Sequence, residues 1–262
     1  MYATAVEDGV VRANPIQGVR VPAASDQADD ESEAKVLTRA ELALVLAALP
    51  ERWRLFFEFL THTGLRISEA IGLTWEHIEL GRRPRVLVRE QVYNGKRRRL
   101  KTRQGRREIR LSPAMAERLR AHRRDAYSGD RAPVFATGTG TELSRPNLAR
   151  RVLKPAAKAA GLTVEREGER VPWVSFHTFR HTCASLLFES GRNVKQVAEW
   201  LGHADPAYTL RRYVHLLDDG IGDPDFLDDV VTADPAQVNT GSTQGPQMAA
   251  NQTASEAMEM AD

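Results

Sequence analysis

The chain has almost no cysteine and lacks any long apolar segment. Cys183 is the only cysteine, so an internal disulfide is impossible and a cysteine-rich metal site is excluded; we expect it to pack in the core. A run of roughly 18 apolar residues, which a membrane-spanning helix needs, does not occur. The N-terminus also lacks the basic and apolar regions of a secretory signal. These absences indicate a cytoplasmic protein.

Positive charge is scarce at both ends of the chain. Residues 218–262 contain ten acidic residues and no lysine or arginine, and residues 1–34 contain seven acidic residues and two arginines. The middle, residues 35–217, therefore holds 35 of the 37 basic residues but only 18 of the 35 acidic ones, a net charge of +17. A solvated surface of mixed charge does not explain such an excess of one sign, which favours a polyanionic partner.

Composition divides the chain into five segments. We expect residues 1–22 to be the end of a preceding domain, 23–34 an acidic linker, 35–217 the functional domain, 218–231 an acidic C-terminal segment, and 232–262 a disordered tail.

The middle segment shows both strand and helix patterns. Alternation over 85–93, the Asn94-Gly95 turn and two further strand-like runs up to residue 112 predict a three-stranded antiparallel sheet with a basic face. Apolar periodicity, with capping residues such as Thr38 and Ser175, predicts helices elsewhere. They lie between Thr38 and Pro50, after Gly64, and over about 51–62, 113–127, 145–160, 176–189, 193–201 and 206–216. The predicted fold class is α+β, mainly α.

Six residues in five short islands form a set that could cleave a phosphodiester without a metal. The islands are TGLRISEA (63–70), RLKTRQGRRE (99–108), SFHTFRHT (175–182), WLGH (200–203) and LRRYVHL (210–216), and the residues are Arg66, Lys101, His177, Arg180, His203 and Tyr213. Arginine, lysine and histidine can neutralise the phosphate and move its protons, and a tyrosine can attack it. Arginine suits the non-bridging oxygens because its planar fork stays charged.

Each of these residues has a simpler interpretation when taken alone. Arg66 could face solvent, and His203 could cap the carbonyls of a helix end. His177 and His181 have the spacing of a zinc-binding pair, but position 178 is Thr rather than the Glu of a metalloprotease motif and no third ligand is evident. His181 is better read as a supporting residue. Tyr208 and Tyr93 compete with Tyr213 as nucleophile, although they fit a packing role and a strand position.

The basic residues around Lys101 are predicted to contact the DNA backbone, which positions DNA without reading its sequence. They are Lys96, Arg97, Arg98, Arg99, Arg103, Arg106 and Arg107.

Over residues 35–217 the chain resembles the tyrosine recombinase (phage integrase) family, most of all integrases of actinobacterial phages and mobile elements. The resemblance rests on TGLRISEA, the KT-x-x-G-R-R hairpin, H-x-x-R-H-T, LGH, and a tyrosine ten residues later, in the family's order. It implies a mostly helical catalytic domain with a small antiparallel sheet.

The resemblance also implies roles for the residues. Tyr213 would form a 3′-phosphotyrosyl intermediate while Arg66 and Arg180 hold the phosphate. Lys101 would protonate the 5′-oxygen, His177 would exchange protons with the tyrosine, and His203 would bond the phosphate. Glu69 matches an acidic position that supports the site. Neither ATP, metal nor another cofactor is implied.

The partners implied are double-stranded DNA, three further copies of the chain on recombining sites, and a possible directionality factor. AVEDGVVRANPIQGVRVP resembles only the end of the helical DNA-binding domain that usually precedes the catalytic one, so the sequence predicts an N-terminally truncated member. A DNA-binding remnant without recombination activity and a strand-passage enzyme resembling type IB topoisomerases are the alternatives.

Overall fold

The computed structural model describes residues 34–100, 102 and 104–214. The segments expected over 1–22, 218–231 and 232–262, and nearly all of the expected linker, lie outside the described residues. Within the described residues, no helix is both long and apolar enough to cross a membrane.

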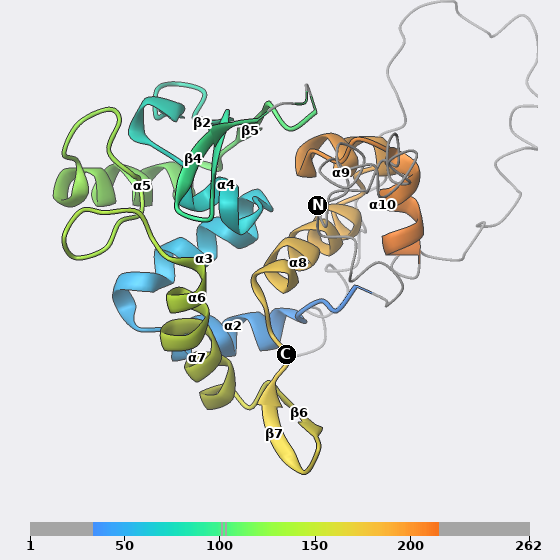
Figure 1. Cartoon of the computed structure of the whole chain (residues 1–262). Coiled ribbons are helices and arrows are strands. Elements are labelled where there is room, and N and C mark those ends of the chain that lie inside the picture. Colours follow the sequence, from blue (N-terminus) through green and yellow to red (C-terminus); the bar gives the residue numbers. More distant parts are fainter. Residues whose placement is uncertain (1–33, 101, 103, 215–262) are drawn as a thin grey trace, which may run out of the picture. The chain divides into compact units, whose positions relative to one another are not determined.

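The described part begins with three helices, drawn in blue to cyan in Figure 1. They are α2 (Arg39–Ala48), α3 (Glu51–Thr63) and the short α4 (Ile67–Ile71). Thr38 caps α2 in a reciprocal pair with Glu41, as the sequence predicts. Gly64 ends α3 in the left-handed conformation (φ 62°). A side chain there would also collide with Leu201, since an added Cβ would lie 2.6 Å from its Cδ2, so only glycine lets α3 end so close to that residue.

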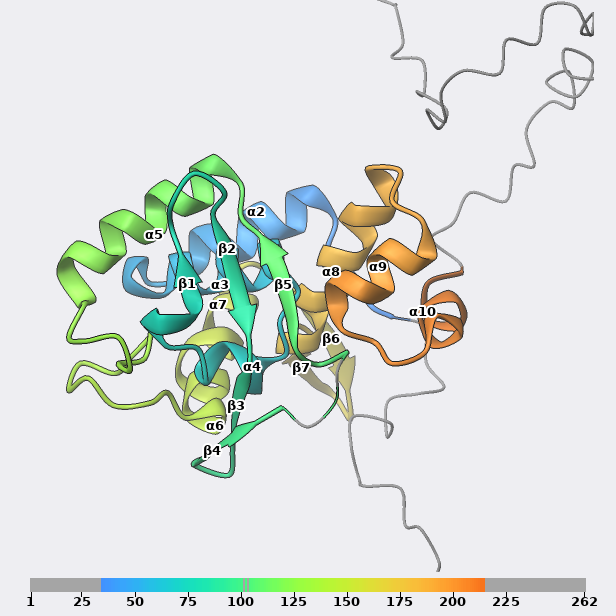
Figure 2. The same ribbon diagram turned by 90° about the horizontal axis from the view of Figure 1, so that it is seen from above.

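Among the described residues, the β-structure consists of a three-stranded sheet and two separate hairpins. Their strands are β1 (Ile78–Glu79), β2 (Arg85–Val88), β3 (Glu90–Tyr93), β4 (Lys96–Arg99), β5 (Arg107–Arg110), β6 (Thr163–Arg166) and β7 (Glu169–Pro172). The antiparallel sheet has the order β1-β2-β5, with Val86 opposite both Ile78 and Ile109. Figure 2 shows this sheet from above, with the β3–β4 hairpin extending beyond the end of β2.

A three-stranded antiparallel sheet is therefore present, but its membership differs from the prediction. The run 85–93 breaks at Arg89 into β2 and β3, and β3 pairs with β4 alone. The short strand β1 supplies the third member. The β6–β7 hairpin was not predicted; its turn places Glu167 (φ 52°) and Gly168 (φ 78°) in the left-handed region, and a Gly inside an alternating polar run was the available signal.

The remaining α-helical segments match the predicted positions within a few residues, whereas the short 3₁₀ helix η2 (Trp75–His77) was not predicted. The matching segments are α5 (Pro113–Ala126), α6 (Arg145–Leu148), the π-helical η3 (Ala149–Leu153), α7 (Lys154–Ala159), α8 (Phe176–Glu189), α9 (Val194–Leu201) and α10 (Pro206–Tyr213). The helix expected over 145–160 is thus one continuous run with a π turn in its middle. Ser175 caps α8, and Gly202 ends α9 with a φ of 72°.

Helices α3 and α8 pack side by side through aromatic residues. Phe57 of α3 lies 5.1 Å from Phe179 of α8, ring centre to ring centre, and both are fully buried. Burial of such rings is a main source of folding free energy, of order 25 cal/mol per Å² of apolar surface. This packing fixes the end of α3, and hence Gly64 and Arg66, against the first turns of α8.

Candidate active site

Arg66 begins α4, directly after the turn that ends α3. Its backbone N–H donates to Glu69 Oε2 (2.9 Å), and its Nη1 donates to Glu69 Oε1 (3.1 Å). Its side chain is 30% exposed, so the guanidinium is held by Glu69 while part of its surface stays accessible. The sequence alternative of an arginine pointing freely into solvent is not what the structure shows.

Glu69 is the buried anion around which the site's arginines gather. Its side chain is 1% exposed and accepts from Arg107 Nη1 (3.2 Å) and Nη2 (3.0 Å) as well as from Arg66. Burial alone would raise the pKa of Glu69, but Arg107, then Arg66 and Arg180, outweigh it and lower the pKa to about 2. Glu69 is therefore ionised at neutral pH.

Arg107 is placed differently from the prediction, which assigned it to the DNA backbone. Its side chain is only 7% exposed. Besides Glu69, it donates to the Trp200 carbonyl (2.8 Å) and the Gly105 carbonyl (3.2 Å). An added Cβ on Gly202 would lie 2.7 Å from Arg107 Nη1, so the glycine of LGH makes room for this guanidinium. The structure thus places Arg107 inside the protein, where it joins the sheet to Glu69 and α9, instead of on the surface of the hairpin.

Arg180 ties three of the islands together. Its Nη1 donates to the Gly64 carbonyl (2.5 Å) and its Nη2 to the Leu201 carbonyl (2.8 Å). These carbonyls lie two residues before Arg66 and two before His203. Burial, followed by the charge of Arg66, lowers the pKa of Arg180 to about 9, so it still carries its proton at neutral pH.

His203 lies at the end of α9 and faces a cavity of about 380 Å³. Gln104, Arg106, Arg107, Glu199 and Gly202 line the same cavity. Its Nδ1 lies 2.7 Å from the hydroxyl of Thr209, and Tyr208 packs edge-on against its ring at 5.0 Å. Burial, then Arg180, Arg66 and Arg107, lower the pKa of His203 to about 2, which keeps it neutral. Tyr208 thus packs on the site's histidine, as its predicted packing role requires.

Tyr213 ends α10 with its ring wholly buried. Its hydroxyl lies 2.6 Å from Nδ1 of His181, and its ring packs 5.9 Å from that of Phe188. Burial raises the pKa of Tyr213, and burial, then Arg212 and Arg180, lower the pKa of His181 to about 3. The pair is therefore a neutral imidazole bonded to a protonated phenol.

The sequence did not single out His181 as the residue in contact with Tyr213; the resemblance gave proton exchange to His177. The His177 ring lies 6.4 Å from that of His181, one helical turn earlier on α8. The i, i+4 spacing of the two histidines could have suggested that either reaches the tyrosine. Among the described residues, no three His, Cys, Asp or Glu side chains gather as metal ligands would.

The other predicted DNA contacts fall into three groups. Arg103 lies outside the described residues, as does the predicted catalytic Lys101. Lys96, Arg98, Arg99 and Arg106 are exposed. Arg97 is half-buried and bonds within the protein, to the Gly72 carbonyl (2.5 Å), Glu90 (3.1 Å) and Glu142 (2.7 Å).

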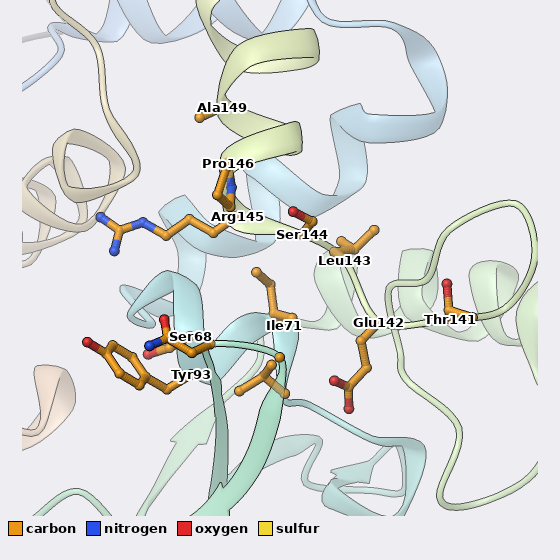
Figure 3. A pocket seen from close by; sticks show the side chains of 13 residues that line it. Ser68, Ile71, Tyr93, Thr141, Glu142, Leu143, Ser144, Arg145, Pro146 and Ala149 are labelled. Carbon is orange, nitrogen blue, oxygen red and sulfur yellow. The ribbon is translucent and has the colours of Figure 1, made fainter.

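A larger cavity of about 880 Å³ lies beside the hairpin, between α4 and the start of α6. Figure 3 shows its lining, with the side chains of Tyr93 and Arg145 extending toward the same side. None of the five predicted catalytic residues that the structure describes lines it. The cavity that His203 faces is therefore the better candidate for the reacting phosphate.

The family model "Phage integrase family" matches residues 35–219. Curated relatives include a XerC-like tyrosine recombinase from Caldanaerobacter subterraneus, 26% identical over 81% of this chain and 59% of its own. The tyrosine recombinase XerD of Corynebacterium glutamicum is 30% identical over 84% of this chain and 68% of its own. The integrase of mycobacterium phage L5 is 26% identical over 79% of this chain and 54% of its own. The chain thus spans roughly half to two thirds of the length of these relatives.

Solved structures share the fold. A Tn1549 transposon integrase bound to transposon right-end DNA aligns with a TM-score of 0.60 at 21% identity, over 88% of this chain and 75% of its own. A lambda integrase tetramer bound to a Holliday junction aligns with a TM-score of 0.51 at 22% identity, over 85% of this chain and 57% of its own. The sequence motifs occur in the family's order, the structure brings their segments together, and the family model matches residues 35–219. This chain belongs to the phage integrase family.

Proposed function

We propose that the chain is a site-specific DNA recombinase that cuts and rejoins DNA through a 3′-phosphotyrosyl intermediate, with residues 35–217 as its catalytic domain. One observation carries the proposal. The paired carbonyl bonds of Arg180 hold the segments of Arg66 and His203 together, and Tyr213 lies on the helix next to them. Three sequence islands far apart in the chain meet where a phosphodiester would need cations and a nucleophile.

The proposed step is a transesterification. The phenol oxygen of Tyr213 attacks the phosphorus, the bond from phosphorus to the 5′-oxygen breaks, and the released 5′-oxygen takes up a proton. Lys101 is the proposed donor of that proton, and the proton of Tyr213 passes to a neighbouring histidine, His177 in the family's pattern. Attack by a 5′-hydroxyl reverses the step, so the bond energy is kept and no nucleotide is consumed.

The cations of the site act on the developing negative charge. The Arg66 side chain is partly exposed, and the buried Arg180 keeps its proton at neutral pH. Neutral His203 can donate a hydrogen bond to a non-bridging oxygen from the cavity wall. Such preorganised donors stabilise a charged transition state more than the same groups would in water.

The proposed partner is double-stranded DNA, and the proposed assembly is a tetramer of this chain on two recombining sites, with a directionality factor as a possible further partner. The net charge of +17 over 35–217 supports a polyanion. The lambda integrase relative is a tetramer on a Holliday junction, which is the source of the assembly proposal.

The test is covalent trapping on a nicked suicide duplex carrying the element's attachment DNA. We expect wild type to form a protein–DNA adduct and Tyr213→Phe to form none while still binding the duplex. Tyr208→Phe is the matched control, because Tyr208 packs on His203 from the same helix. Loss of trapping in Tyr208→Phe with retention in Tyr213→Phe would refute the nucleophile, and loss on adding EDTA would refute metal-free chemistry.

Adduct formation followed by plasmid relaxation without recombinant product would favour the type IB topoisomerase alternative. Binding without any adduct would favour a DNA-binding remnant.

A further inference from the structure

We infer that a second, smaller cavity, framed by four arginines next to the candidate active site, binds a backbone phosphate of DNA beside the one that is cleaved. The cavity has a volume of about 240 Å³ and is lined by Arg89, Arg99, Arg106 and Arg131, together with Glu76, His77 and Glu90. This volume is below the range of roughly 300–1,000 Å³ that is typical of small-molecule pockets, and a cavity of this size suits a single phosphate group. The inference rests on the proposed function, because it names DNA as the source of the phosphate.

The charge of this cavity is positive after its own acids are counted. Four guanidinium groups face two carboxylates, a formal excess of two positive charges. Glu90 is also engaged outside the cavity by Arg97 (3.1 Å), which weakens its hold on the lining arginines. His77 adds no charge, because its pKa is lowered. Burial is the main cause; Arg89 and Arg97 lower the pKa further, and together these effects outweigh the opposite effect of Glu76 and Glu90.

The arginines differ in how they are held, and the difference suits a binding site. Arg89 sits at the break between β2 and β3, where its Nη1 donates to the carbonyls of Val88 (3.3 Å) and Arg107 (3.2 Å). It is therefore a fixed wall of the cavity. Arg99 and Arg106 are exposed, and neither side chain forms an ion pair or hydrogen bond with another residue in the described part of the chain.

Arg131 is the fourth arginine that lines the cavity. Its side chain is 88% exposed, and its contact with Glu76 is long at 3.9 Å. An exposed pair at that distance contributes little, of order 0–1 kcal/mol, so Arg131 can turn to an incoming phosphate at small cost. A phosphate accepts two parallel hydrogen bonds from a guanidinium, which makes arginine the suitable residue here.

Arg106 connects this cavity to the candidate active site. It also lines the cavity that His203 faces, so the two cavities share one arginine. A DNA strand places a phosphate about every 3.4 Å along the helix axis. A strand whose reacting phosphate lies at His203 has further phosphates a few ångströms away, and the four-arginine cavity, which shares Arg106, is a charged recess that can take one of them.

The experiment compares two double variants in salt-dependent binding to a fluorescent 30-base-pair duplex, measured by anisotropy. Arg99→Gln with Arg131→Gln removes two cations of the cavity without touching Arg106. Arg82→Gln with Arg83→Gln is the matched control, since both are exposed arginines in the loop before β2, at the end of that strand opposite to Arg89. We expect the cavity variant to flatten the plot of log K against log salt by about 0.9, the value for one phosphate contact, and to weaken binding about 5- to 10-fold near 0.1 M salt.

The control should keep the wild-type slope. A cavity variant with the wild-type slope, or a control that loses as much, overturns the inference. Wild type that binds no DNA or shows a flat salt response would instead overturn the proposed function, so the two failures are distinguishable.

A second arm separates DNA from a free anion as the source of the phosphate. Binding of the duplex is measured with inorganic phosphate replacing chloride at constant ionic strength. We expect no specific competition, because a single phosphate lacks the neighbouring contacts that DNA makes. Competition by phosphate that disappears in Arg99→Gln with Arg131→Gln would overturn DNA as the intended ligand and identify a free phosphate site.

Discussion

The site has a buried half and an exposed half, and both are rich in arginine. In the buried half, Arg107 and Arg180 are enclosed, and they donate hydrogen bonds to Glu69 and to backbone carbonyls, respectively. In the exposed half, Arg98, Arg99 and Arg106 along the hairpin stand in solvent. The same side chain therefore builds the site in one place and is available to an incoming polyanion in the other, and burial makes the difference.

The largest expected effect comes from removing a buried arginine. Arg107→Gln would leave the Glu69 carboxylate enclosed with one main partner gone, and breaking a buried pair typically costs about 3–5 kcal/mol of unfolding free energy. Arg98→Gln, on the exposed strand β4, should change stability by less than about 0.5 kcal/mol. Urea denaturation of both variants checks this. Equal free energies of unfolding for the two variants would show that the buried arginine contributes no more to stability than the exposed one.

The second prediction concerns the stability of the fold at acidic pH. The folded pKa of Glu69 is about 2 against an ordinary value of 4.5. A lowered carboxyl pKa stabilises the fold fully above about pH 4.5, and that contribution, of order 3 kcal/mol, is lost as the pH falls toward 2. Urea denaturation between pH 6 and 3 should show wild type losing stability more steeply than Glu69→Gln. Parallel curves would mean that Glu69 is not held as an anion by its arginines.

The smallest expected effect concerns Tyr213. His181→Phe keeps a ring on α8 but leaves the buried Tyr213 hydroxyl without the nitrogen that it contacts, at a cost of about 1–3 kcal/mol. The matched experiment adds Tyr213→Phe to each background in a double-mutant cycle. Because the hydroxyl has already lost its partner, Tyr213→Phe should cost less in the His181→Phe background than in wild type. Additive costs would show that the 2.6 Å contact contributes nothing.

Much of the fold could be predicted from local patterns. The Thr38–Glu41 capping pair, the glycines that end α3 and α9, and the Asn94-Gly95 turn are each set by neighbours in sequence. The break at Arg89 was missed because the alternation of 85–93 continues through it, and only the pairing of β2 with β5 reveals where one ladder ends.

The sequence predicted which residues gather at the candidate site better than it predicted the contacts among them. Arg66, Arg180 and His203 meet as the motif order suggests. The burial of Arg107 and the contact of Tyr213 with His181 were not foreseen, because each depends on a partner 38 or 32 residues away.

By itself, the sequence determined the set of reactive side chains, their order, the strong positive charge of residues 35–217, and the elements that carry them. Only the tertiary structure decided which arginines are enclosed, which histidine contacts the tyrosine, and which cations line a recess beside the site. Residue type and spacing determine local conformation through short-range hydrogen bonds and sterics. Burial and charge pairing depend on contacts such as that of Arg180 with Gly64, 116 residues apart, which exist only once the helices have packed.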